Sequence, residues 1–351
     1  MTSSELTDIR RARALLGGGG CVGPIGLTGP QGPAGPLFDT QITTAIYVDF
    51  LRSDTYTESG SRAYPFKTLG SAYTLAAASA TDSNPKIIVL LSGNTVAENI
   101  TFSVGHIFIT GENSSGTHGP IVFTGSLTFT GPNTSLSSNH FAVSGLALIG
   151  VSGTSVITFS GSYPQRLFMR DVWITANGTS HGINMTNVGT GSTLHMNDSK
   201  FSHNGSGDYH CLTIVAGTAN IDTSETSGTT VGAFGISGGA VNITGSDIQT
   251  SGSYAIELAG GTLSVANSKI TTTAANSIGI MMSTGTAAVI GNVSFSVPAS
   301  LTTGRAISGV SGSILYYAAL YFLPDGIGGT TNSKIDSAIT ETVISTTITL
   351  V

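Results

Sequence analysis

The amino-acid sequence predicts an all-β protein, a right-handed parallel β-helix with three sides, which follows a short N-terminal helix and a collagen-like segment. Three observations predict this architecture. A strand motif recurs every 22 to 27 residues, the composition favours strands and tight turns over helices, and glycine occupies every third position in one early stretch. Together they indicate a repetitive, elongated protein.

The composition is poor in charge and rich in small polar residues. Charged residues make up 9% of the 351 residues, whereas hydrophobic residues, at 40%, suffice for a core; an average soluble domain has about 25% charged residues. Serine, threonine, asparagine and the 47 glycines are weak helix formers and good turn residues. The net charge of −6 gives no reason to expect nucleic acid as a partner. No stretch reaches the ~18 apolar residues of a membrane helix, so membrane insertion is not expected.

A six-residue strand motif recurs seven times in the body of the chain. Its first residue is apolar, its third is small or polar, and a second apolar strand follows the later copies. This period fits one turn of a three-sided parallel solenoid, in which like residues stack on the turn below. An ordinary β-sandwich is the alternative, but it would not explain the repeat. The motifs begin at Val143, Met169, Met196, Ile221, Ile243, Val265 and Ile290, and the second strands are 182–185, 212–215, 233–236, 255–258 and 278–281.

The repeat also divides the chain. We expect an N-terminal cap over residues 38–86 and the β-helix over 87–300. Residues 301–351 change character, since 314–323 are aromatic and apolar and 338–351 alternate as a β-strand does. They are expected to form the second cap and an oligomer contact.

The first sixteen residues have the pattern of a short docking helix. Thr2 and Glu5 fit a capping box, and glycines from Gly17 on end the segment. A helix of about fourteen residues is marginal alone, so we expect it to fold against a partner; a disordered tail is the alternative. The residues expected to anchor it are Leu6, Ile9, Arg10, Arg11 and Arg13.

Residues 17–37 resemble a collagen stalk. Six glycines are spaced three apart, and proline follows four of them. Only glycine fits the axis of a collagen triple helix, and six triplets need neighbouring trimer contacts to hold three strands together. A homotrimer is therefore expected, and an extended polyproline-like linker is the alternative. The glycines of the stalk are Gly20, Gly23, Gly26, Gly29, Gly32 and Gly35.

The segment that enters the body carries a recognisable pattern. Tyr47-Val48-Asp49 is followed by Pro65-Phe66-Lys67-Thr68-Leu69 and an alanine-rich helix predicted over 69–79, which Thr68 can cap. This resembles the entry of pectate-lyase-like β-helix proteins, although Arg52-Ser53 replaces the glycine that usually precedes Asp54. The resemblance implies the β-helix fold and a helix that covers its open end. It implies no particular chemistry, because the entry occurs in enzymes, adhesins and tail or capsid proteins.

The order of docking peptide, stalk and β-helix resembles surface proteins of large DNA viruses and of phage tails. The resemblance implies a spike, fibre or minor capsid component at the virion surface. Residues 1–16 would bind other virion or capsid proteins, and the rod would bind a host surface glycan or receptor. A cellular or spore-surface adhesin is the alternative, as is a polysaccharide lyase or glycoside hydrolase. We expect no enzymatic activity and no cofactor.

Candidate polar sites are few. Asp171, Asp198, Asn267 and Asn292 share the third place of the repeat, which predicts a polar ladder; a catalytic pair of Asp171 and Asp198 is the alternative, since glycoside hydrolysis needs two carboxylates about 5–10 Å apart. No metal motif is present, and no metal is expected. Cys211 lies in an apolar run and predicts a buried thiol. A polar stretch that could hold a metal or sugar, but is more typical of a solvated loop, contains His203, Asp208 and His210.

The stalk leads to a prediction about assembly. The intact chain should be a trimer, because the glycine triplets form a stable triple helix only when three copies are held together. Native mass spectrometry of the full chain and of a chain lacking residues 1–37 measures this directly. A monomer in both forms would contradict the trimer.

Overall fold

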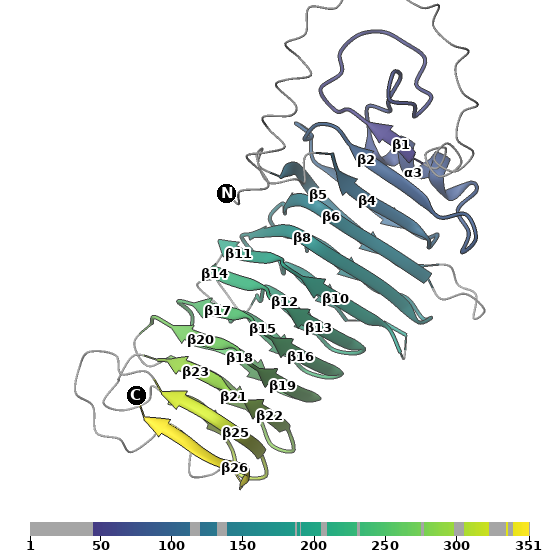
Figure 1. Ribbon diagram of the computed structural model, residues 1–351. Helices are drawn as coiled ribbons and strands as arrows, with labels where there is room; N and C mark the ends of the chain where they lie inside the picture. Colours follow the sequence, from purple (N-terminus) through teal and green to yellow (C-terminus); the bar gives the residue numbers. More distant parts are fainter. Residues whose placement is uncertain are drawn as a thin grey trace, which may run out of the picture. The chain divides into compact units, whose positions relative to one another are not determined.

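The computed structural model describes residues 45–112, 120–131, 139–186, 188–189, 191–204, 209–229, 232–274, 277–297, 305–322, 335 and 340–350. The predicted docking helix and collagen-like stalk lie outside these residues. The described chain is all-β apart from one helix, and it forms a parallel β-solenoid of about eight turns. Figure 1 shows the strands lying side by side along the solenoid in the order of the sequence.

Three series of parallel strands form the sides of the solenoid. Each strand pairs with the equivalent strands of the turns before and after it. The first side contains β1 (Ala45–Val48), β2 (Lys86–Leu90), β4 (Ile107–Gly111), β6 (Asn139–Ile149), β8 (Gln165–Asn177), β10 (Thr193–Asn197), β13 (Thr218–Asp222), β16 (Ala240–Thr244), β19 (Thr262–Ala266), β22 (Ala287–Gly291), β25 (Ile314–Phe322) and β26 (Thr340–Leu350).

The second and third sides follow the same rule. The second side contains the first half of β5 (Ile121–Phe129) and the later halves of β6, β8, β25 and β26. Its other strands are β11 (Lys200–Asn204), β14 (Glu225–Thr229), β17 (Asp247–Thr250), β20 (Lys269–Thr272) and β23 (Val293–Ser296). The third contains β3 (Glu98–Phe102), the later half of β5, β7 (Ile157–Phe159), β9 (Ile183–Met185), β12 (Leu212–Ile214), β15 (Phe234–Ile236), β18 (Tyr254–Leu258), β21 (Ile278–Met282) and β24 (Arg305–Gly309).

The register predicted from the repeat is confirmed. The first residues of the seven motifs are direct Cα partners in successive turns, from Val143 with Met169 to Val265 with Ile290. The second strands correspond to β9, β12, β15, β18 and β21 within a few residues at each end. The prediction of one strand per motif holds for the motifs at Val143 and Met169, which lie within β6 and β8. In the other five motifs the strand is interrupted where the chain turns the corner between the first and second sides.

The corner residue has a left-handed backbone. Strand β10 ends just before Asp198 (φ 49°), and the chain then continues in a new direction as β11. Glycine, asparagine and aspartate adopt this conformation most readily. The predicted polar ladder is therefore confirmed as a stack of corners, and Asn292 Nδ2 donates to Asn267 Oδ1 at 2.7 Å. The stacked corner residues are Gly145, Asp171, Asp198, Thr223, Gly245, Asn267 and Asn292.

A row of buried serines follows these corners. Ser246 Oγ accepts from the backbone N–H of Ser224 in the preceding turn at 3.2 Å and donates to the carbonyl of Thr244 in its own turn at 3.0 Å. Ser199, Ser224 and Ser268 repeat this arrangement. Each hydroxyl thus satisfies a donor and an acceptor that the bend removes from the strand ladder. The row ends at Val172 and Val293, where the same inward position is apolar.

The core is a continuous column of apolar side chains inside the turns. Phe102, Phe129 and Phe141 stack at its beginning, with ring centroids 5.0 and 4.9 Å apart. The helix α3 (Leu69–Ala77) buries Leu69, Ala72 and Ala76 against this end.

The helix N-cap predicted at Thr68 is confirmed. Thr68 Oγ1 accepts from the backbone N–H of Ser71 at 3.2 Å, and the helix ends two residues before the predicted end. Glu98 accepts from the N–H groups of Leu69 and Gly70 at the same terminus. Within the described residues, no helix is long and apolar enough to cross a membrane.

The C-terminal strands continue the solenoid. β24 pairs with β21, β25 pairs with β22 and β23, and β26 pairs with β25, all in parallel. In the described residues, the segment 301–351 thus extends the same stacking. Its proposed role as an oligomer contact stays a prediction.

The serine row leads to a stability prediction. Ser224→Ala should lower the free energy of unfolding by about 1–3 kcal/mol, because a buried donor and acceptor lose their partner. Ser264→Ala is the control; this serine lies on the outward face of β19, and its loss should change stability by less than about 0.5 kcal/mol. Chemical denaturation of both variants measures the difference. Equal stabilities would contradict a role for the row.

Candidate ligand-binding face

The second residue after each corner points away from the core. The residue directly after the corner is buried, and side chains alternate along a strand, so the next one is outward. These outward residues are Cα partners from turn to turn and are separated by the ~4.8 Å strand spacing. We call the following aligned residues the outer row: Trp173, Lys200, Glu225, Asp247, Lys269 and Ser294, which follow the corners from Asp171 to Asn292, and Tyr321, which is the Cα partner of Ser294 on β25.

The outer row has aromatic side chains at both ends and charged side chains between them. Trp173 is 44% exposed, and Lys200 Nζ lies 5.7 Å from the centroid of its ring. Lys200 Nζ also lies 2.8 Å from Glu225 Oε2. An exposed ion pair of this kind adds little stability. The pair therefore contributes little to the stability of the fold.

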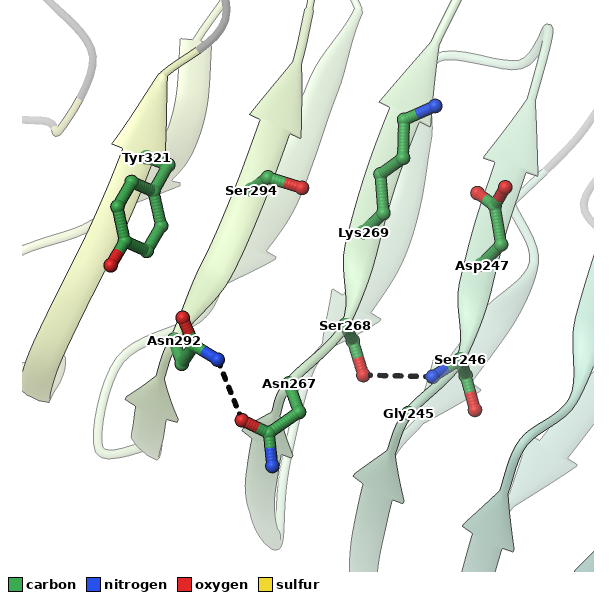
Figure 2. Close-up of a pocket in the computed structure, with 9 residues that line it drawn as sticks. All are labelled: Gly245, Ser246, Asp247, Asn267, Ser268, Lys269, Asn292, Ser294 and Tyr321. Atoms are coloured by element: carbon green, nitrogen blue, oxygen red, sulfur yellow. Dashed lines mark hydrogen bonds between the residues drawn. The ribbon is translucent and has the colours of Figure 1, made fainter. Parts of the chain in front are cut away.

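The later part of the row forms one wall of a polar groove. The hollow has a volume of about 420 Å³ and is lined by side chains and backbone from four neighbouring turns. Figure 2 shows Tyr321 at one end, Asp247 at the other, and the hydrogen-bonded pair Asn292 and Asn267 between them. The lining residues are Gly245, Ser246, Asp247, Asn267, Ser268, Lys269, Asn292, Ser294 and Tyr321.

The groove offers a mixed set of hydrogen-bonding groups. The amides of Asn267 and Asn292 supply donors and acceptors, Lys269 supplies an ammonium and Asp247 a carboxylate. Asp247 Oδ2 also accepts from Gln249 Nε2 at 3.0 Å, which fixes the carboxylate. Tyr321 adds an aromatic face with a polar end. This combination suits a ligand with many hydroxyl groups and apolar C–H faces, which is the chemistry of a sugar chain.

The carboxylates of the ladder lie at corners, where Asp198 links one turn to the next. Asp171 and Asp198 both occupy left-handed corners on successive turns, and both are exposed. Asp198 Oδ1 accepts from Thr223 Oγ1 at 2.7 Å, and Asn197 Oδ1 accepts from the same hydroxyl at 2.6 Å. These contacts link corner to corner along the stack.

The predicted polar stretch at residues 203–210 is only partly described. Asp208 lies outside the described residues. The side chain of His203 is buried, and its Nε2 lies 2.8 Å from the carbonyl oxygen of Ser180. His210 is also buried. The interpretation of these two histidines as part of a solvated loop is wrong, because both side chains are buried.

His181 links the two buried histidines. Its Nδ1 accepts from the backbone N–H of His210 at 3.1 Å and lies 2.9 Å from Thr213 Oγ1. The rings of His181 and His210 are parallel, with centroids 6.2 Å apart. Gly235 leaves the room for this stack, since a Cβ there would lie 2.7 Å from His210 Nδ1.

Burial shifts the pKa of two groups in this region, His181 and Cys211. Desolvation lowers the pKa of His181 below its ordinary value, and the neighbouring His203 lowers it further. Burial raises the pKa of the Cys211 thiol to about 12, and the predicted buried thiol is confirmed.

The outer row was missed in the sequence, although a signal for it exists. Its members from Trp173 to Ser294 occupy the fifth place of each motif, two positions after the ladder residue. The predicted anchoring residues and stalk glycines of the first 37 residues lie outside the described chain. Within the described chain, the predicted polar ladder borders the groove, because two of its residues, Asn267 and Asn292, line the groove.

Comparison of the chain with models of known protein families, with curated proteins and with solved structures found no significant match. The resemblance to pectate-lyase-like proteins therefore rests on the quoted residues alone. The fold is established by the strand pairing, and the function has to be argued from the surface.

The lowered pKa of His181 leads to a prediction about pH. Folding lowers the pKa of His181 below its ordinary value of 6.5. The neutral side chain therefore favours the folded state above pH 6.5, and this contribution to stability is lost as the pH falls below 6.5. The free energy of unfolding should therefore fall between about pH 7.5 and about pH 5.5. His181→Gln keeps hydrogen-bonding capacity without titrating in this range, so its decrease should be smaller. Denaturant titrations at both pH values measure this, and an unchanged decrease in the variant would contradict it.

Proposed function

We propose that this chain is a structural protein of a virion surface, a spike, fibre or minor capsid component, whose solenoid attaches to a host glycan. The observation that carries the glycan part is the outer row with its polar groove. The virion location is supported by the order of docking peptide, collagen-like stalk and β-helix in the sequence. Residues 1–16 would hold the chain to other virion or capsid proteins.

The groove supports a polyhydroxylated ligand better than an apolar or a nucleic-acid ligand. Its walls combine amide, hydroxyl, carboxylate and ammonium groups with one aromatic ring. A strongly basic surface, which phosphate binding needs, is not offered, because Lys269 stands beside Asp247 in the row. Aromatic rings at both ends of the outer row allow contacts beyond the groove along an extended chain.

Shallow sites of this kind bind weakly one at a time. A trimer carried on a stalk would present three equivalent rows, and many copies on one particle would multiply the contacts with a glycan-covered surface. A high affinity of the single groove is therefore not required for attachment.

Glycan binding can be tested with two matched tyrosines of β25. Tyr321 lies in the groove, whereas Tyr316 lies on the first side of the same strand, and both are half-buried. Against the glycans bound by the full chain on an array, Tyr321→Ala should bind at least about tenfold more weakly, or ~1.4 kcal/mol, and Tyr316→Ala should bind unchanged. Surface plasmon resonance on the strongest glycan gives the affinities.

The same samples distinguish an enzyme from a binding protein. Mass spectrometry of the oligosaccharides after long incubation with the full chain should show no shortened products. Release of fragments would contradict a purely attaching role and would indicate a polysaccharide depolymerase instead. Binding that Tyr321→Ala and Lys269→Ala leave unchanged would remove the groove from the proposal.

A further inference from the structure

A second cluster of chemically active side chains lies on the first side of the solenoid, away from the outer row. It consists of Asp82, in the turn before β2, His106, in the turn before β4, and His140, in β6. One ring nitrogen of each histidine and one carboxylate oxygen of Asp82 lie within 4.8 Å of one another. His106 Nδ1 and Asp82 Oδ1 are 3.6 Å apart.

The backbone holds both histidines firmly. His106 has a left-handed conformation with φ 61°, which is uncommon for a residue with a side chain. Its N–H donates to the carbonyl of His140 at 2.6 Å, and its own carbonyl accepts from the N–H of Lys86 at 2.9 Å. Three successive turns thus meet at this point, and the conformation aims the imidazole of His106 toward Asp82.

The imidazole of His140 leaves hydrogen-bonding capacity unused, and the ring of His106 packs beside it. His106 is only 7% exposed, so its ring is largely removed from water. Nε2 of His140 is covered and has no hydrogen-bond partner among the described residues. A buried polar nitrogen without a partner carries a desolvation cost, which a bound cation would offset.

We propose that Asp82, His106 and His140 form a binding site for one divalent transition-metal ion, with Zn²⁺ as its probe. Neutral imidazoles and a carboxylate are the ligands that zinc and its neighbours take in proteins. Zinc with nitrogen and oxygen ligands at about 2.0–2.1 Å brings ligand atoms to about 3.3 Å from one another, so the cluster has to contract slightly. The exposed Asp82, on the short turn of residues 81–84, can supply that movement.

The charged neighbours of the site oppose each other. Arg166, the Cα partner of His140 on the next turn, opposes a bound cation, and Asp82 supplies the negative charge that compensates for it. Imidazoles bind a metal through a nitrogen that carries no proton. The ion would join the turn at 81–84 to the first turns of the solenoid.

The site is tested on the full chain without an affinity tag, since a histidine tag would bind the same ion. Calorimetric titration with ZnCl₂ should give one ion per chain and a higher unfolding temperature that EDTA reverses. Asp82→Asn and His140→Gln should each weaken binding at least about tenfold, or ~1.4 kcal/mol. Asp82 is exposed, so its substitution tests the site even if a histidine variant fails to fold.

Matched controls separate this site from other surface histidines. His195→Gln removes a half-buried histidine that stacks on Phe168 on the same side of the solenoid, and Asp222→Asn removes an exposed carboxylate elsewhere. Both should bind Zn²⁺ as the original chain does. The visible absorption of bound Co²⁺ should disappear in Asp82→Asn and persist in the controls. No saturable binding by the original chain, or equal binding by Asp82→Asn and the controls, would overturn the proposal.

Discussion

The left-handed corner between the first and second sides is the constraint on which the rest of the structure depends. Parallel strands can pair on both sides of a sharp bend only if every turn bends at the same place, because the ladders fix the register of each turn on the next. A residue such as Asp198 or Asn267 meets that demand with a left-handed backbone. The bend then turns the following residue inward and the one after it outward, which creates both the serine row and the outer row.

The register of the turns could be predicted from the sequence, because the apolar residues that begin each motif stack on their equivalents and repeat with them. The corner could not be predicted in the same way. Two consecutive outward residues, such as Arg170 and Asp171, mark it, but the inward residue that follows is often a serine, as at Ser199. Serine is usually exposed, so its presence hides the reversal. In the interior, the hydroxyl of Ser199 accepts from the backbone N–H of Val172, 27 residues earlier in the chain.

The histidines show the same limit of sequence reasoning. His203 and His210 lie in a polar stretch and look solvated, yet the turn that contains Ser180 and His181 packs against them. Their burial depends on partners about 23 and 29 residues earlier in the chain. Likewise, Asp82, His106 and His140 have no motif spacing, and only the stacking of turns brings them together. A single sequence gives little indication of which residues on different turns become neighbours.

In the proposed function, the same stacking would allow a shallow groove to bind a glycan without mobile loops. Its lining side chains project from regularly paired strands, and the corner amides of Asn267 and Asn292 are already bonded to each other. Binding therefore orders few side chains, and the entropy cost that usually weakens polar surfaces is small. The fixed strand spacing also limits the ligands that fit, since successive contacts have to recur at about 4.8 Å along the row. A chain of similar units meets this condition, whereas a compact molecule contacts one or two turns.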